Sequence, residues 1–383
     1  MRQRIVILGS TGSIGRHTLD VIDHLGSRCS VVGLAAGTRS EVLAEQAQKY
    51  HPTHVAIADA SGFQHLCGAL DNEATLLNGD RGLVELVEKS DCDCVVAAIV
   101  GAAGLPATLR AVELGKTIAV ANKETLVTAG SIIMPQAKRA GARLIPIDSE
   151  HSAIFQAMRA GHPSEVRKVY LTASGGPFRT ASIEEMRNAT LDDALNHPTW
   201  SMGPKITIDS ATMMNKALEI IEAKWLFDLK PNQIEVVIHP ESIIHSLVEF
   251  CDGSVVAQLG TPDMRTPIQY ALTCPQRLPR SSEPLDLVGT GQMNFHAPDL
   301  DKFPALRLGH EAARRGGTAG AVLNAANETA VELFRGGDIR FGEIVELSAQ
   351  VFERHAFVAE PTLEQLLAVD RWARSEVNQC VIC

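Results

Sequence analysis

Residues 4–15 read Arg4-Ile5-Val6-Ile7-Leu8-Gly9-Ser10-Thr11-Gly12-Ser13-Ile14-Gly15, an apolar strand that runs into a glycine-rich turn and opens a helix. In such a turn Gly9 permits the sharp bend, Gly12 lets a pyrophosphate approach the backbone, and Gly15 lets helix and strand pack closely. The free N–H groups of the helix start then face the anion. The spacing is G-x-x-G-x-x-G rather than G-x-G-x-x-G, so a purely structural glycine turn is the alternative.

Short apolar stretches alternate with helical ones from this turn to about residue 145. The expected strands are residues 5–8, 31–35, 55–58, 94–99, 117–120 and 143–147, and residues 40–49 form a helix. Strand–helix alternation implies right-handed crossovers and a parallel sheet. We therefore predict a Rossmann-like, doubly wound nucleotide-binding domain over residues 1–147.

The rest of the chain has a different pattern. Strands are expected at residues 169–173, 234–238, 246–250 and 255–259, with a hairpin turn at 251–254 and a helix over about 211–227. We predict a central α+β catalytic domain over 148–280, with a lid loop at 186–206. A linker at 281–303 and a C-terminal helical bundle at 304–383 follow, and helices are expected at 304–315, 318–334, 341–354 and 362–377. The fold class is α/β.

Composition and charge exclude several classes of protein. The 383-residue chain has a net charge of −10 and no basic run, which argues against a nucleic-acid partner. No apolar run is long enough for a membrane span, and the first strand begins at once, without a signal segment. Eight scattered cysteines without zinc spacing are typical of a reduced, cytoplasmic protein.

The end of the second strand favours NADP over NAD. It reads Ala35-Ala36-Gly37-Thr38-Arg39-Ser40, with no acidic residue for the ribose hydroxyls of NAD. Arg39 could pair with a 2′-phosphate. The alternative is an ordinary solvated surface arginine.

Two polar groups follow further strands, at the edge where ligands bind in such sheets. Asn122, Lys123 and Glu124 come directly after the strand at 117–120, although a helix cap with a local ion pair is the alternative. Asp148 and Glu150 follow the strand at 143–147 and would point the same way from an extended segment. Adjacent carboxylates favour a cation between them, and oxygen ligands favour Mg²⁺ or Mn²⁺. A solvated turn or an N-cap is the alternative.

A second group of candidates lies in residues 206–219. Asn215, Lys216 and Glu219 share one helical face, and Ser210 is expected near a helix start. Hydroxyl, amide and ammonium groups suit a phosphate, and Glu219 would give the cation a third carboxylate. The alternative is a surface ion pair with Ser210 as its cap.

Two loops complete the set. Ser174-Gly175-Gly176 follows a strand and could hold a phosphate with its amides, or be a plain turn. The segment 196–203 contains His197 and Trp200 between helix breakers and is typical of a lid that excludes water. Trp200 could instead anchor the loop in a core. His239 and His245 lie in and near strands, where histidines are more often structural, but His245 is also a candidate neighbour of the site.

Read in order, the blocks GSTGSIG, ANKE, DSEH, SGGPF, NHPTWSMG, DSATMMNKALE, HPESIIH and PDMR resemble the 1-deoxy-D-xylulose 5-phosphate reductoisomerase family. The resemblance covers nearly the whole chain. It implies NADPH-dependent isomerisation and reduction of 1-deoxy-D-xylulose 5-phosphate to 2-C-methyl-D-erythritol 4-phosphate, in the non-mevalonate isoprenoid pathway. It also implies a divalent cation (Mg²⁺ or Mn²⁺) and a homodimer.

The resemblance assigns roles by position. The cofactor would lie against Thr11, Gly12, Ser13, Ile14, Gly37, Thr38, Arg39, Asn122, Glu124 and Gly203, and the cation against Asp148, Glu150 and Glu219. Substrate contacts would come from Lys123, Ser149, Glu150, Ser174, His197, Trp200, Met202, Ser210, Asn215, Lys216, Glu219 and His245, with Lys123, Glu150 and His197 as catalytic candidates. At Gly37-Thr38-Arg39 relatives often carry Lys and Asn, which puts the contact geometry in doubt rather than the cofactor.

Two other readings remain open at this point. A metal-independent, NADP-linked dehydrogenase of the semialdehyde or homoserine kind would keep its activity after chelation of metals. A nucleotide-binding regulator would bind NADPH without turnover of any sugar phosphate. The three-acid group argues against both.

Overall fold

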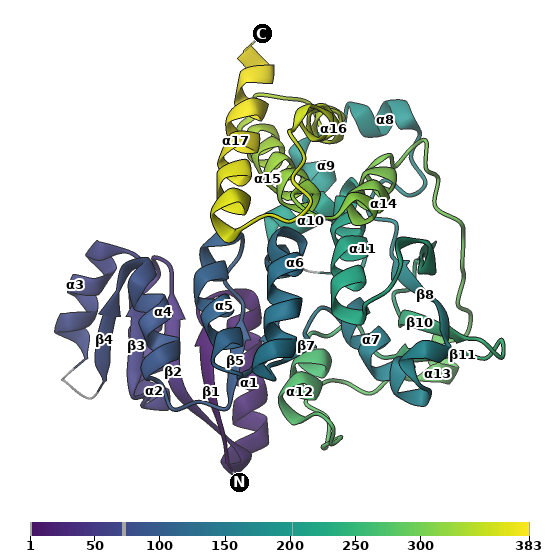
Figure 1. Ribbon diagram of the computed structural model, residues 1–383. Coiled ribbons are helices and arrows are strands. Elements are labelled where there is room, and N and C mark those ends of the chain that lie inside the picture. The colour runs from purple at the N-terminus through teal and green to yellow at the C-terminus, as the bar shows by residue number, and fades with distance from the viewer. Residues whose placement is uncertain (1, 71–73, 201, 383) are drawn as a thin grey trace. The chain divides into compact units, whose positions relative to one another are not determined.

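The computed structural model describes residues 2–70, 74–200 and 202–382 (Figure 1). Contacts divide the chain into two compact units that are not consecutive in sequence. The first unit holds Met1–Thr125, Ile133–Ser152 and Asp263–Glu283, and the second holds Leu126–Ile132, Ala153–Pro262 and Pro284–Cys383. The predicted division into three consecutive domains and a linker remains a prediction.

The first unit is built on a seven-stranded parallel sheet with the order β4-β3-β2-β1-β5-β6-β7. Its strands are β1 (Gln3–Leu8), β2 (Cys29–Ala36), β3 (His54–Ile57), β4 (Thr75–Asn78), β5 (Cys94–Ala97), β6 (Thr117–Val120) and β7 (Arg143–Pro146). The chain winds outward from β1 to β4 and then returns to the other side of β1 with β5. Because ligands bind at such a change of direction, the carboxyl ends of β1 and β5 are the expected ligand edge.

The predicted Rossmann-like sheet is confirmed, and its centre is fully buried. Ile5, Val6, Ile7 and Leu8 have no exposed surface. Helices α1 (Ser13–Leu25), α2 (Ser40–Tyr50), α3 (Ala60–Ala69), α4 (Gly79–Lys89), α5 (Leu105–Glu113) and α12 (Arg265–Thr273) belong to this unit. Strand β4 was not predicted, because Thr75–Asn78 is short and only Leu77 of it is buried.

The second unit contains a four-stranded mixed sheet with the order β11-β10-β8-β9. Its strands are β8 (Val166–Ala173), β9 (Ile234–Ile238), β10 (Ile244–Phe250) and β11 (Val255–Leu259). Strand β10 is antiparallel to β8 and β11, and β9 is parallel to β8. The predicted hairpin at 251–254 is confirmed, with Gly253 at φ +85°.

Helices make up the rest of the second unit. They are α8 (Ile183–Arg187), α9 (Leu191–Leu195), α10 (Pro204–Ala211), α11 (Met214–Phe227), α13 (Leu287–Thr290), α14 (Ala305–Arg315), α15 (Ala319–Gly336), α16 (Glu343–Arg354) and α17 (Leu363–Ile382). The four predicted C-terminal helices are confirmed. Helices α6 (Lys123–Ala140) and α7 (Ser149–Ala157) each contain residues of both units.

Local structure differs from the prediction in three places. The segment 147–151 is not extended, because α7 begins at Ser149. Ser210 lies in the last turn of α10 rather than near a helix start. The predicted lid loop 186–206 contains α9 and the first turn of α10, and its residue 201 lies outside the described residues. In the part of the chain that the structure describes, no helix is long and apolar enough to cross a membrane.

Candidate active site

The glycine turn after β1 leaves room for a ligand at one glycine. A Cβ at Gly9 would lie 2.5 Å from the carbonyl oxygen of Ala98, and one at Gly15 would lie 2.3 Å from that of Gly9. Both glycines are therefore required by packing. A Cβ at Gly12 would meet only the Gly9 oxygen, at 3.4 Å. Gly12 is the N-cap of α1 and carries no side-chain cap, so the helix start can receive an anion.

Arg39 lies over this turn. Its Nη1 donates a hydrogen bond of 3.1 Å to the carbonyl oxygen of Thr11. The predicted partner of a 2′-phosphate is thus held close to the predicted pyrophosphate turn. Both come from the ends of neighbouring strands, β1 and β2.

Asn122 organises the next strand ends. Its Oδ1 accepts a hydrogen bond from the Thr125 N–H as the N-cap of α6, and its Nδ2 donates to the carbonyl oxygens of Ile99 and Gly101. The loop after β5 is therefore fixed to the start of α6. Lys123 and Glu124 follow at this helix start, and both are buried.

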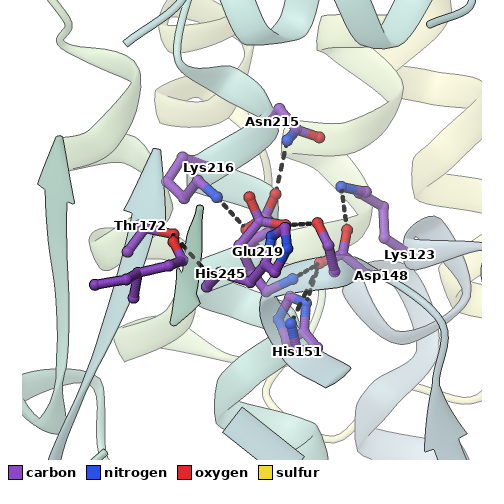
Figure 2. A network of polar contacts seen from close by, with 11 residues as sticks. Lys123, Asp148, His151, Thr172, Asn215, Lys216, Glu219 and His245 are labelled. Carbon is purple, nitrogen blue, oxygen red and sulfur yellow. Dashed lines mark hydrogen bonds and ion pairs between the residues drawn. The ribbon is translucent and has the colours of Figure 1, made fainter. Parts of the chain in front are cut away.

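Asp148 caps helix α7, which explains why the segment is not extended. Its Oδ1 accepts from the backbone N–H groups of Glu150 and His151. The same oxygen lies 2.9 Å from Nδ1 of His151, and Oδ2 lies 3.1 Å from Nζ of Lys123 (Figure 2). Within the first unit a lysine and a histidine thus converge on one carboxylate.

Of two neighbours of Asp148, Ser149 was predicted as a site residue and His151 was not. Ser149 donates its hydroxyl hydrogen bond to Glu150, a predicted metal ligand in the first turn of α7. His151 has no exposed surface and contacts Asp148, yet it received no role. Its only signal in the sequence was its place in the DSEH block.

In the second unit, Ser174 and His197 form a hydrogen-bonded pair. Nε2 of His197 lies 3.0 Å from the Ser174 hydroxyl, and Nδ1 of His197 accepts from the N–H groups of Thr199 and Trp200. An imidazole nitrogen that accepts two amide hydrogen bonds carries no proton, so the proton is on Nε2. Burial lowers the pKa of His197, which favours the same neutral form.

The Ser174 hydroxyl has a hydrogen left to donate. Its oxygen accepts from the Gly176 N–H at 3.2 Å and from His197. Gly176 has φ +64°, and a Cβ there would lie 2.8 Å from the carbonyl oxygen of Ser210. The turn after β8 therefore packs against the last turn of α10, and the two predicted phosphate serines lie in neighbouring segments.

A strained residue joins α10 to α11. Met213 is buried and has φ +61°, a left-handed conformation that costs a residue with a side chain on the order of 1 kcal/mol. Thr212 supports it by accepting a hydrogen bond from the Met214 N–H with its hydroxyl oxygen. The turn sets the direction in which α11 starts, and Asn215 and Lys216 are in its first turn.

One carboxylate on α11 is surrounded by donors. Oε1 of Glu219 accepts from Nδ2 of Asn215 and Oε2 from Nζ of Lys216, each at 2.6 Å (Figure 2). Lys216 is 3% exposed and Glu219 is fully buried. Because both side chains are buried, this is not the solvated surface pair considered above. Two buried charges are tolerated only when they are paired.

His245 lies at an irregularity in β10. The pairing with β11 shifts register between Ile244 and Ser246, a bulge that redirects a side chain. The ring of Trp200 lies 6.3 Å from that of His245, so the predicted lid contacts this strand. Gly203, after Met202, is the N-cap of α10.

The chain matches known protein families over most of its length. It matches the family model described as 1-deoxy-D-xylulose 5-phosphate reductoisomerase over residues 5–130, and the two C-terminal domain models of the same enzyme over residues 144–227 and 259–376. The chain belongs to the 1-deoxy-D-xylulose 5-phosphate reductoisomerase family. The resemblance read from the blocks is confirmed.

Relatives and solved structures of this family match along their whole length. The chain is 51% identical to the reductoisomerase of Acetivibrio thermocellus over 100% of both chains, and 50% identical to that of Symbiobacterium thermophilum over 99% of both. A reductoisomerase crystal structure with NADPH, fosmidomycin and magnesium has a TM-score of 0.94 at 44% identity, covering 99% of this chain and 98% of that one. The Zymomonas mobilis enzyme with NADPH also has a TM-score of 0.94, at 42% identity, covering 100% and 99%.

Each unit therefore brings some of the predicted residues together. The first unit joins Thr11 to Arg39 and Lys123 to Asp148, and the second joins Ser174 to His197, Glu219 to Asn215 and Lys216, and Trp200 to His245. The roles of these residues remain predictions.

Proposed function

We propose that this chain converts 1-deoxy-D-xylulose 5-phosphate into 2-C-methyl-D-erythritol 4-phosphate with NADPH and a divalent cation, as a step towards isoprenoid precursors. The observation that carries the proposal is the match to one enzyme family in three blocks from residue 5 to residue 376. NADPH and magnesium appear together in the solved structure with a TM-score of 0.94.

NADPH fits the first unit. Its pyrophosphate would be held by Thr11, Gly12, Ser13 and Ile14. The space beside Gly12 is open, and the start of α1 has no side-chain cap. Gly37, Thr38 and Arg39 would meet the adenosine phosphate. Asn122, Glu124 and Gly203 would lie along the remainder of the cofactor.

A divalent cation fits the chemistry of the acidic groups. The described Asp, Glu and His residues that could hold a metal ion include Asp148, His151 and Glu219. We propose that Asp148, Glu150 and Glu219 provide the oxygen ligands preferred by Mg²⁺ and Mn²⁺, with His151 fixing Asp148. When bound, the cation supplies Lewis acidity to the oxygens of the substrate and NADPH supplies hydride.

Two of these acids are paired with lysines. Lys123 contacts Asp148 and Lys216 contacts Glu219. Because an ammonium has three N–H donors, each lysine could also donate to an anionic substrate oxygen. We propose that Lys216 turns to the phosphate and that Lys123 turns to the reacting end.

The phosphate of the substrate would be held in the second unit. Ser174 can donate its remaining hydroxyl hydrogen, and His197 can donate from Nε2. Ser210, Asn215 and Lys216 would supply the other donors. His197 would act as a neutral donor that orients the phosphate, since its Nδ1 is held by two backbone amides.

The reacting end would lie between Lys123, Ser149 and Glu150, which we propose as the residues that hold and move protons at the substrate hydroxyls. Trp200, Met202 and His245 would cover it and exclude water. We also propose that the protein works as a homodimer in the cytoplasm, on a small-molecule substrate, without a nucleic-acid or membrane partner.

One assay tests the function. Purified protein is mixed with NADPH and 1-deoxy-D-xylulose 5-phosphate, with Mg²⁺, with Mn²⁺, or after exhaustive chelation, and absorbance at the NADPH band is followed. We expect oxidation only when both the sugar phosphate and a cation are present. No oxidation under any condition would refute the proposal.

The family match does not favour the metal-independent dehydrogenase of the semialdehyde or homoserine kind. That enzyme would oxidise NADPH in the chelated sample with an aldehyde substrate. Product analysis of the complete reaction for the branched tetrol phosphate separates the two functions.

A further inference from the structure

His239 is a fully buried histidine to which the proposed function gives no role. It follows β9 and begins the turn that leads into β10. Its ring and its backbone bind three separate segments of the second unit. Two of these segments lead directly to residues proposed to bind the substrate.

The ring holds the start of β10. Nε2 of His239 accepts hydrogen bonds from the N–H groups of Ile243 at 3.2 Å and Ile244 at 3.1 Å. Nε2 is therefore unprotonated and the ring proton is on Nδ1. The turn between them is strained, because Ser242 has φ +52°. Without this acceptor one buried amide, that of Ile244, and one partly buried amide, that of Ile243, would lose their partner.

The other side of the ring holds a distant segment. Nδ1 lies 2.9 Å from the carbonyl oxygen of Asn294 and 3.0 Å from Oε2 of Glu241. The ring stacks on Phe295 at 4.9 Å, with 18° between the planes. Asn294 in turn donates from Nδ2 to Glu241 at 2.6 Å. The segment after α13 is thus fastened to the turn.

The backbone of His239 reaches the phosphate turn. Its N–H donates a hydrogen bond of 2.7 Å to the carbonyl oxygen of Ala173, the residue before Ser174. One residue therefore fixes the backbone next to Ser174 and, through Ile244, the backbone next to His245.

Thr172 also holds the start of β10, through its carbonyl groups. Its hydroxyl lies 2.9 Å from the carbonyl oxygen of Ile244 and 2.7 Å from that of His245. These carbonyls lie at the bulge in β10. The amides that precede the bulge are held by His239 and the carbonyls within it by Thr172.

We propose that His239 is a positioning residue for the sugar-phosphate substrate, which sets the spacing between Ser174 and His245 without contacting the substrate. This inference rests on the proposed function of the same site. It deepens that function by making the β9–β10 turn part of substrate affinity.

Two substitutions test the two ring nitrogens of His239 separately. In His239→Asn the side-chain amide can still donate to Asn294 but cannot reach the two amides of β10. In His239→Gln the side-chain oxygen can take the place of Nε2 and keep them satisfied. We expect His239→Asn to raise KM for 1-deoxy-D-xylulose 5-phosphate about tenfold, because the amides of Ile243 and Ile244 lose their acceptor. His239→Gln should stay within about threefold of the parent.

Three further measurements make the test decisive. The kcat of both variants and the Kd for NADPH should stay near the parent values, because the cofactor turn lies elsewhere in the chain. His296→Asn is the matched control, since His296 is exposed and binds Ile238 through its backbone alone. Thr172→Val removes the hydroxyl from the other side of the bulge and should also raise KM, even if His239→Asn does not fold.

The outcomes separate the two proposals. If the unmodified protein does not oxidise NADPH with the substrate, the proposed function fails. If it is active while folded His239→Asn and Thr172→Val keep the parental KM, the positioning role is refuted. A lower melting temperature with unchanged KM would show a purely structural histidine and refutes it as well.

Discussion

The two units build their candidate sites from different materials. In the first unit the cofactor turn is made of main chain, and its decisive residues are Gly9, Gly12 and Gly15, within seven positions. In the second unit the site is made of side chains, and its centre is a buried ion pair between Lys216 and Glu219. Added atoms should therefore damage the main-chain site most. Loss of a charge should damage the side-chain site most.

The largest effect is expected from Glu219→Gln, which tests the side-chain site. The change removes a proposed metal ligand and leaves the Lys216 ammonium, 3% exposed, without its buried carboxylate. We expect metal-supported turnover to fall by about 1,000-fold or more, in line with the several kcal/mol that a catalytic metal supplies. NADPH affinity, measured by fluorescence titration, should not change.

Glu235→Gln is the matched control for this substitution. Glu235 is an exposed carboxylate on β9 that also pairs with a lysine, Lys168. Exposed ion pairs contribute about 1 kcal/mol or less, so this variant should keep full turnover. Full activity of Glu219→Gln would remove Glu219 from the cation site.

The next effect tests the main-chain site at Gly12 and Gly15. Gly12→Ala adds a methyl group to open space at an unstrained φ of −75°, so the fold should persist while NADPH affinity falls about 100-fold. Gly15→Ala would place Cβ 2.3 Å from a backbone oxygen and should lower the melting temperature strongly. Melting curves and NADPH titrations distinguish the two.

Gly68→Ala is the control for these variants. Gly68 lies in α3, where a Cβ would meet no atom within 4 Å. In a helix, alanine is favoured over glycine by about 0.5–1 kcal/mol. The control should therefore melt no lower than the parent. If Gly12→Ala bound NADPH as tightly as the parent, the proposed pyrophosphate position would be wrong.

The same difference explains how far the sequence alone could lead. The parallel sheet, the glycine turn and the four C-terminal helices were predictable because strand, turn and helix signals are local. Asp148 shows the limit: alternation along a strand predicted an extended segment, but its side chain caps α7 instead. An aspartate after a strand can either continue the extended segment or cap a following helix. The alternation of residues along the strand does not decide between the two.

Side-chain partners distant in the chain were less accessible. The helical spacing placed Lys216 and Glu219 on one helical face and offered an ion pair between them as the alternative. It did not predict that both are buried, which depends on packing with other helices. The contacts of His239 with residues 243, 244 and 294 require the β9–β10 turn and a segment more than fifty residues away. No spacing rule in the sequence links them.

A smaller effect is expected from the contact between α10 and the C-terminal helix α15. Buried Asp209 on α10 accepts a hydrogen bond of 2.8 Å from Nδ2 of Asn327 on α15. Asn327→Asp would face one buried carboxylate with another and should destabilise the protein by about 3 kcal/mol. The double variant Asp209→Asn with Asn327→Asp restores a donor and an acceptor.

Denaturant unfolding of the parent, Asp209→Asn, Asn327→Asp and the double variant checks this coupling. We expect the double variant to recover most of the loss, and Lys205, which pairs with Asp209 at 2.9 Å, to account for the remainder. A double variant as unstable as Asn327→Asp would show that the two side chains are not coupled.

The smallest effect is expected from acidification, through His197. Burial lowers the pKa of this histidine below its ordinary value of 6.5, so as pH falls the unfolded chain takes up the proton before the folded one does. The stability that neutral His197 contributes is therefore complete above pH 6.5 and is lost as pH falls from 6.5 through the folded pKa.

His197→Gln keeps a donor for Ser174 but cannot titrate. The difference in unfolding free energy between parent and variant should then fall on acidification, with a slope of at most one proton. The half-buried His54 and His310, whose pKa values are also lowered by burial, are common to both proteins and cancel in the difference. A difference that stays constant from pH 7.5 to 5 would mean that His197 gives up its Nδ1 contacts without cost, and that the lid is not held by this ring.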